Sequence, residues 1–175
     1  MWAGRMDDIM RATEELAAWR VRITKGSAQS WLEKWANQGG RDSDVLVLRS
    51  DMVFGLDHIR SALYHAKRAM DQGRNASNTL VMETLLYASG ERQLQSAIRK
   101  LSPDKDTEEI VIACLRGKRL VPDIDWLPLE AMIEDAPHAR MKAFGIGVAE
   151  SQTVGPGKAT ELVLERVAAV DITKK

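Results

Sequence analysis

Apolar residues recur every three or four positions in several stretches of this chain, which is the spacing of a helix with one buried side. The clearest stretch is 54–72. Ile59, Ala62 and Ala66 fall on one face of this predicted helix, and Gly73 ends it. The same spacing predicts further helices over 7–19, 27–37 and 91–101, and we also expect a short helix around 138–144 and a last, apolar-rich helix over 158–170.

Two of the predicted helices have features of their own. Residues 78–89 are apolar on almost every side, which is typical of a helix buried among other elements. The helix over 7–19 would carry Leu16 and Trp19 on its apolar face. Helices therefore make up most of the predicted structure.

Three shorter stretches have the composition or alternation of strands. In 19–26, Val21 and Ile23 alternate with polar residues, which predicts a half-buried strand. Residues 45–48 predict a second strand, and 110–115 lack polar alternation, so we expect the third strand at the centre of its sheet. The order of elements predicts an α+β fold, with a small, mostly antiparallel sheet covered by a helical cluster.

The chain has 175 residues, which fits one domain. We expect residues 1–18 to form a helical extension and residues 19–175 to form the single α+β domain. Within that domain, 116–137 is acidic, contains three prolines and is expected to be a loop, and 145–157 is expected to be irregular.

The composition is that of a soluble globular protein, with 45% hydrophobic and 29% charged residues. No apolar run approaches the ~18 residues of a membrane span, and acids near the start do not fit a signal peptide. We therefore expect a cytoplasmic protein that does not enter the membrane. The net charge is zero, but 54–100 is mildly basic and 101–137 is clearly acidic, which suggests two faces with different tasks.

The sequence offers little catalytic chemistry. Cys114 lies inside an apolar run, where a buried and inert strand residue is expected. The glycine-containing stretches 145–150 and 154–160 lack the residues and the preceding strand that nucleotide-binding loops need. His58 and His65 would lie two helical turns apart, which is too far for one metal ion. We expect no cofactor, no metal and no small-molecule substrate.

One face of the 54–72 helix is rich in basic residues. It carries His58, Arg60, His65, Lys67 and Arg68, and Arg74 follows its end. Lysine and arginine there could neutralise phosphates, and histidine could stack on unpaired bases. An ordinary solvated helix face is the alternative.

An ordered set of features over 45–100 resembles a known family. A strand is followed by a histidine-containing helix, then by Gly73-Arg74-Asn75-Ala76, by a helix with Glu83 and Tyr87, and by Gly90-Glu91-Arg92-Gln93. The segments RVRITKGSAQSWLEKW and LVLERVAAVDI are similar to the same family. This is the kinase-binding, tRNA-binding accessory subunit of the KEOPS complex, called the PRPK-binding protein in higher organisms. The resemblance covers 20–115 and 160–172, and the divergence from eukaryotic forms favours an archaeal sequence.

The resemblance implies a non-catalytic subunit. Its family joins the atypical kinase of a complex that installs threonylcarbamoyladenosine in tRNA, and it holds the single-stranded 3′ CCA end. The expected tRNA-binding residues are His58, His65, Lys67, Arg68, Arg74 and Arg92. The expected kinase-binding residues, on the last helix, are Val163, Arg166, Val167 and Val170.

Three alternatives stay open from the residues alone. The last helix could close the core instead of binding the kinase. The chain could be a structural homodimer or a regulatory protein-binding module without RNA. A small-molecule enzyme would need a pocket with perturbed titratable groups.

Overall fold

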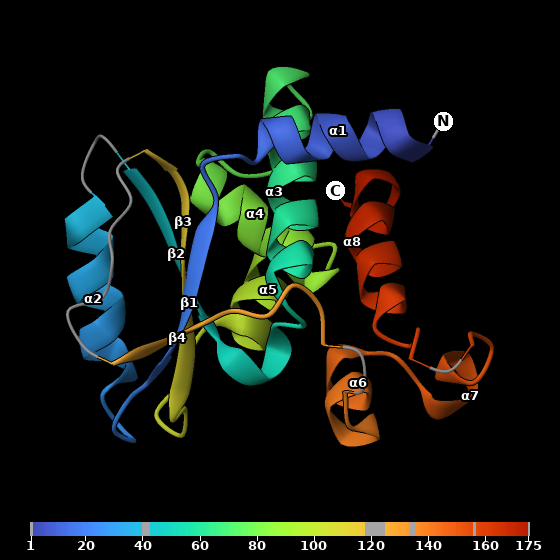
Figure 1. Ribbon diagram of the computed structural model, residues 1–175. Helices are drawn as coiled ribbons and strands as arrows, with labels where there is room; N and C mark the ends of the chain where they lie inside the picture. The colour runs from blue at the N-terminus through green and yellow to red at the C-terminus, as the bar shows by residue number, and fades with distance from the viewer. Residues whose placement is uncertain (1, 40–42, 118–124, 134–135, 156, 175) are drawn as a thin grey trace.

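A four-stranded sheet divides the protein into two layers of helices (Figure 1). The computed structural model describes residues 2–39, 43–117, 125–133, 136–155 and 157–174. The strands are β1 (Ala17–Arg22), β2 (Ser43–Arg49), β3 (Glu109–Gly117) and β4 (Trp126–Pro128). Their order is β2-β3-β1-β4, and every neighbouring pair is antiparallel. The predicted α+β class is confirmed.

The strand β3 lies between β2 and β1, as its uninterrupted apolar run predicts. Ile110, Ile112 and Leu115 are fully buried, and Cys114 is buried with them. A strand that is covered on both faces needs apolar residues at every position, because neither face meets water. β1 keeps the predicted alternation, with Val21 buried and Arg22 exposed.

The helix α2 (Ala28–Gly39) covers one face of the sheet, and Trp35 packs there against Val21 and Ile112. The other face carries the larger core. It is covered by α3 (Leu56–Asp71), α4 (Leu80–Ser89), α5 (Leu94–Leu101) and α8 (Glu161–Thr173), with the 3₁₀ helix Ser50–Met52 leading into α3. Figure 1 shows α2 on one side of the sheet and these helices on the other.

The helix α4 lies at the centre of the helical layer, which confirms the burial that its all-round apolar pattern predicts. It contacts α3, α5, α8 and β2. The hydroxyl of Thr79 accepts a hydrogen bond from the backbone N–H of Met82 and so caps the first turn. Gly90 ends the helix in the left-handed conformation, with φ 68°.

The first helix, α1 (Trp2–Ala12), ends at Ala12 instead of continuing to residue 19. The prediction for Trp19 was wrong, because this residue belongs to β1, where it contacts Trp126 edge to face. Leu16 is buried in the larger core, as a residue of the turn between the helix and the strand. The helical spacing of apolar residues extends to residue 19, but strand pairing decides the structure of the last part of this segment.

The region expected to be a loop contains a strand, because β4 pairs with β1 through Trp126 to Pro128. The short helix α6 (His138–Phe144) is where the sequence predicts it. The segment expected to be irregular contains one turn of helix, α7 (Val148–Ser151). In the described part of the chain, no helix is both long and apolar enough to cross a membrane.

Candidate functional site

His58 of α3 lies in the core rather than on the basic face. Its side chain is fully buried, its Nδ1 accepts the backbone N–H of Phe54 at 3.2 Å, and its Nε2 is 2.8 Å from the carbonyl of Ala88. Burial lowers the pKa of His58 to about 4, so the ring is neutral at physiological pH. A residue with both ring nitrogens engaged inside the protein cannot stack on a base from this position.

Arg60 lies near the start of α3, where it pairs with Asp57 at 2.8 Å, and the other basic residues of the helix sit nearer to its C-terminal end. Lys67 is half-buried, and its Nζ donates to the carbonyl of Ala12 at 2.7 Å, at the end of α1. Arg68 is exposed. Arg74 is also exposed, in the turn after α3, where its Nε donates to the side-chain oxygen of Gln72 at 3.0 Å.

His65 belongs to a polar network that joins three helices. Its Nδ1 is 2.8 Å from Oδ2 of Asp171 on α8. Its ring stacks on the ring of Tyr87 of α4, with the two ring centroids 5.6 Å apart. The hydroxyl of Tyr87 donates to Oδ1 of the same carboxylate. Burial works to raise the pKa of Asp171, but the hydrogen bonds from Tyr87 and His65 outweigh it and hold the pKa below its ordinary value.

Glu83 extends this network to the loop that carries Arg74. Its carboxylate is fully buried, and Oε2 accepts from the backbone N–H groups of Ala76 and Ser77 at 3.0 and 2.9 Å and from the Ser77 hydroxyl at 2.7 Å. Oε1 accepts from Nζ of Lys174 at 2.8 Å, and Lys174 also donates to the Tyr87 hydroxyl at 2.8 Å. One buried carboxylate thus fixes both the loop after α3 and the end of α8.

The structure brings together only some of the predicted tRNA-binding residues. His65, Lys67 and Arg68 lie along the C-terminal half of α3, and Arg74 follows in the next turn. Arg92 is exposed but lies beyond the other end of the ten-residue α4. A helix of that length separates its two ends by about 15 Å.

An open cleft of about 400 Å³ lies beside Lys67. Its walls come from the end of α3, the start of α4 and the end of β3, which contributes Arg116. Arg116 pairs with Asp44 at 2.8 Å. Among the residues that the structure describes, no three His, Cys, Asp or Glu side chains gather closely enough to hold a metal ion.

The three valines predicted to bind the kinase face the core. Val163, Val167 and Val170 have 0% of their surface exposed, and α8 packs with them against α3 and α4. The last helix therefore closes the core, which is the alternative left open by the sequence. Because the three valines are fully buried, they cannot also touch a partner in this packing. Their spacing of three and four residues is what a buried stripe requires.

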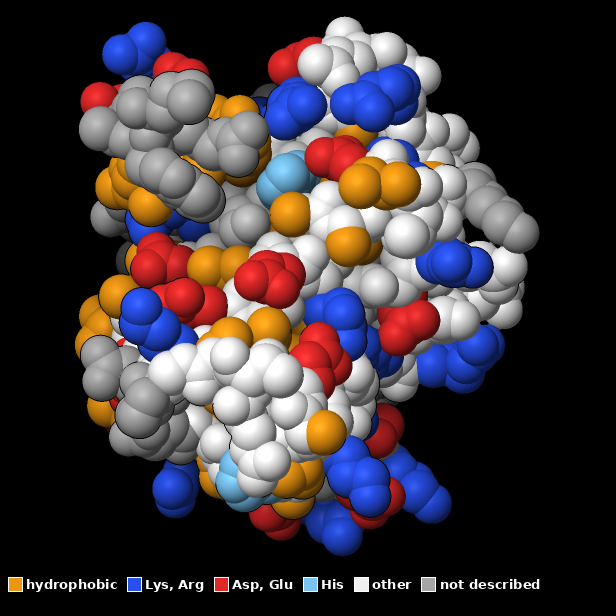
Figure 2. Space-filling view, turned by 90° about the vertical axis from the view of Figure 1, so that its right-hand side faces the viewer, with side chains coloured by type: hydrophobic (Ala, Val, Ile, Leu, Met, Phe, Trp, Pro, Cys, Tyr) orange, Lys and Arg blue, Asp and Glu red, His pale blue; other side chains and the backbone are white. Residues whose placement is uncertain are grey.

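The outward side of α8 carries different residues. Arg166 is partly exposed and forms an ion pair with Glu150 of α7, in which its Nη2 donates to both carboxylate oxygens at 2.8 Å. Ile172 is 88% exposed. Seen from the side of α8, charged residues of both signs are interspersed with small groups of apolar side chains (Figure 2). On this face the charged side chains are therefore mixed in sign and do not form one large surface of a single charge.

Sequence reasoning did not assign roles to Asp171 and Lys174, and it used Glu83 and Tyr87 only as landmarks of a resemblance. Glu83 did leave a signal, because it is the one acidic residue in the otherwise apolar stretch 78–89. A charge at that position must find buried partners. The identity of those partners depends on where α8 ends and could not be read from spacing.

Comparison with known protein families identifies the family of this chain. No curated protein matches the chain. A family model described as "Kinase binding protein CGI-121" matches residues 25–146, from the start of α2 past the end of α6. The match reaches beyond residue 115, where the resemblance read from the sequence became loose, and it leaves out α1 and α8. The chain belongs to the CGI-121 family of kinase-binding proteins, which is the KEOPS subunit family that its sequence resembles.

Proposed function

We propose that this protein is a non-catalytic subunit of the KEOPS complex. In this role it supports threonylcarbamoyladenosine modification of tRNA by binding the atypical kinase and the tRNA 3′ CCA end. The observation that carries the proposal is the match to a kinase-binding family over 25–146. Two exposed features support it: a small cationic cluster at the C-terminal end of α3 and an apolar side chain on α8.

The proposed RNA contact is the cationic cluster, formed by Arg68 and Arg74 beside His65. Both arginines are exposed, and the loop that carries Arg74 is held by Glu83. Each arginine can neutralise a phosphate and release a counterion. Two such contacts on a protein with zero net charge give weak binding. The RNA contact is therefore useful when the complex already holds the tRNA elsewhere.

The proposed kinase contact is the outward side of α8, around Ile172 and Arg166. An isoleucine that is 88% exposed loses water contact favourably when a partner covers it. The valines on the inward side keep the helix in place and so act indirectly. The partner surface should offer an apolar pocket beside groups able to meet Arg166 or Glu150.

Co-purification with the KEOPS kinase tests the kinase contact. Ile172→Glu should abolish co-purification without lowering the melting temperature, because the side chain makes little contact within the fold. Ile98→Glu is the matched control, since Ile98 is also apolar and exposed (38%) but lies on α5. A wild-type chain that fails to retain the kinase would refute the proposed function. If Ile172→Glu retains the kinase as well as the wild type does, only the proposed kinase-binding surface on α8 would be refuted.

Filter binding with tRNA tests the RNA contact. The double variant Arg68→Glu/Arg74→Glu should lose retention. The control Arg99→Glu, which replaces an exposed arginine of α5 that donates to Ser96, should keep it. Removing the 3′ CCA from the tRNA should have the same effect as the double variant. Retention that survives both changes would exclude this cluster. Arg92→Glu reports whether RNA reaches the far end of α4.

A further inference from the structure

The helix α1 is held by few contacts against α3, near the half of that helix that carries Lys67 and Arg68. Met6 and Met10 are 57% and 46% exposed, and of the side chains from 6 to 12 only Ile9 and Ala12 are half-buried. A helix of eleven residues is marginally stable alone, so contacts with the rest of the protein must hold it. Thr13, which is buried, marks the point where firm packing begins.

Lys67 makes a polar contact that holds the end of α1 against α3. Its Nζ donates to the carbonyl of Ala12, one of the terminal carbonyls that have no partner within the helix. The C-terminal end of a helix carries partial negative charge, which favours a lysine there. The same ammonium group lines the 400 Å³ cleft beside α4. The end of α1 therefore occupies a cation that would otherwise be available to a phosphate.

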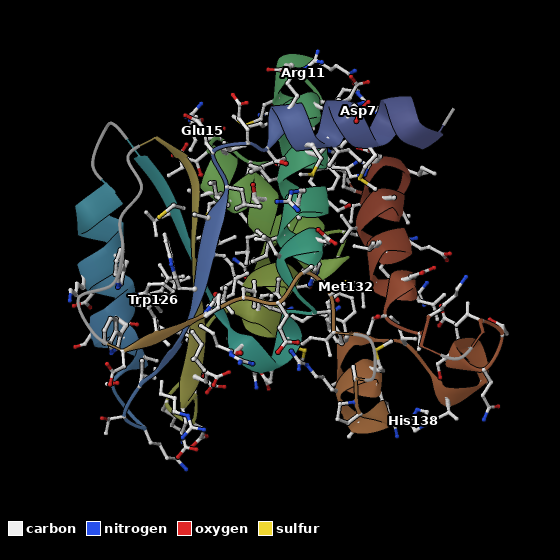
Figure 3. The ribbon with its side chains drawn as sticks, in the orientation of Figure 1. Asp7, Arg11, Glu15, Trp126, Met132 and His138 are labelled. Carbon is white, nitrogen blue, oxygen red and sulfur yellow. The ribbon has the colours of Figure 1, made fainter. Side chains whose placement is uncertain are left out.

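The segment around α1 also has the charge of a competitor for RNA. Between residues 6 and 16 it carries Asp7, Asp8, Glu14 and Glu15 against one basic residue, Arg11. Figure 3 shows Asp7 and Arg11 on α1 and Glu15 just after it, where the segment crosses α3. An acidic segment at this place repels a nucleic acid that approaches the end of α3.

We propose that α1 is a displaceable cover of the RNA-binding surface: RNA that binds at Arg68 and Arg74 competes with the Ala12 carbonyl for Lys67 and releases α1. This inference rests on the proposed function. It assigns a role to a helix that lies outside the part of the chain matched by the family model. In the covered state Lys67 caps α1, and in the open state it meets a phosphate, so α1 lowers RNA affinity until the RNA is held by other contacts.

The test compares tRNA binding across a range of salt concentrations. Ile9→Gln removes the half-buried apolar contact of α1 without adding charge, and Met10→Gln makes the same kind of change at an exposed position. Ile9→Gln should bind tRNA about fivefold tighter than the wild type, because less free energy is needed to displace α1. The slope of the logarithm of the association constant against log salt should be the same for both proteins, because Lys67 meets a phosphate in each bound state. Met10→Gln should bind as the wild type does.

The double variant Ile9→Gln/Lys67→Met shows whether the gain comes through Lys67. It should lose the gain in affinity, and its salt slope should be shallower than that of the wild type by about 0.7, the value for one phosphate contact on single-stranded nucleic acid. In the wild type, RNA should also speed amide hydrogen exchange in residues 6–12, because competition with RNA opens the helix. Equal tRNA affinities for wild type and Ile9→Gln, or a gain in affinity that survives Lys67→Met, would overturn the proposed cover. The absence of tRNA binding by all four proteins would instead overturn the proposed function.

Discussion

Replacing Glu83 by alanine should destabilise the fold more than any surface change, because the fully buried carboxylate serves four donors. Its loss leaves Lys174, whose side chain is 8% exposed, without its anionic partner. It also leaves the Ser77 N–H and hydroxyl without their acceptor. Removing one member of a buried ion pair costs about 3–5 kcal/mol, since the remaining charge stays buried and uncompensated.

Urea unfolding followed by circular dichroism measures this cost. Glu83→Ala should lower the free energy of unfolding by about 3–5 kcal/mol. Lys174→Met in the same background should recover part of the loss, because the stranded ammonium group is then gone. The Ser77 amide should exchange faster in both variants, since its acceptor is absent from each.

A small effect would refute this reasoning. If Glu83→Ala costs under about 1 kcal/mol, in the range of an exposed ion pair, then the network is solvated and does not hold the loop. If Lys174→Met makes the Glu83→Ala protein less stable still, the two residues act independently. Glu83→Gln is the gentler comparison. It keeps one acceptor for the loop but aims an amide at Lys174 or Ser77.

Three further changes test the packing of the helical layer. His58, whose folded pKa of about 4 lies below its ordinary 6.5, stabilises the fold fully above pH 6.5 and less as the pH falls toward 4. Because of this residue, the free energy of unfolding in urea should be about 2 kcal/mol lower at pH 4.5 than at pH 7. The variant His58→Gln should show a smaller difference between the two pH values. Val167→Glu should destroy the helical circular dichroism signal rather than only the kinase contact, because the residue is 0% exposed. Gly90→Ala should lower the unfolding free energy by about 1–2 kcal/mol in a denaturant titration, since φ is 68° and the new Cβ would lie 3.1 Å from Cβ of Arg166.

Periodicity predicted the elements that have one dominant pattern. The helix over 54–72 and the central strand over 110–115 each bury a surface that their own residues define, and both were found at nearly the predicted bounds. Prediction failed where the partner decides the structure. β4 is three residues long and exists because β1 offers it an edge, and Trp19 joins a strand because β3 pairs with it.

The candidate site was harder to predict than the fold, because helical spacing gives neighbours but not the direction of burial. His58 and His65 look alike on a helical wheel. However, the first faces Phe54 and Ala88 in the core, and the second lies at the partly exposed junction with Asp171. The valines of α8 are ambiguous in the same way, since an apolar stripe can face a core or a partner. Only the packing of α8 on α3 and α4 assigns them to the core.

The buried network gives a physical reason why the two proposed contacts, with RNA and with the kinase, would work as one unit. Arg68 and Arg74 are attached to α3 and its following loop, and Ile172 is attached to α8. Glu83 and Lys174 join that loop to the end of α8, and His65 joins α3 to the same end through Asp171. Effective concentration is high only when the spacing between two sites is fixed and matches the partners. A kinase docked on α8 would therefore hold the cationic cluster at a defined place beside the tRNA end, which a loosely attached loop could not do.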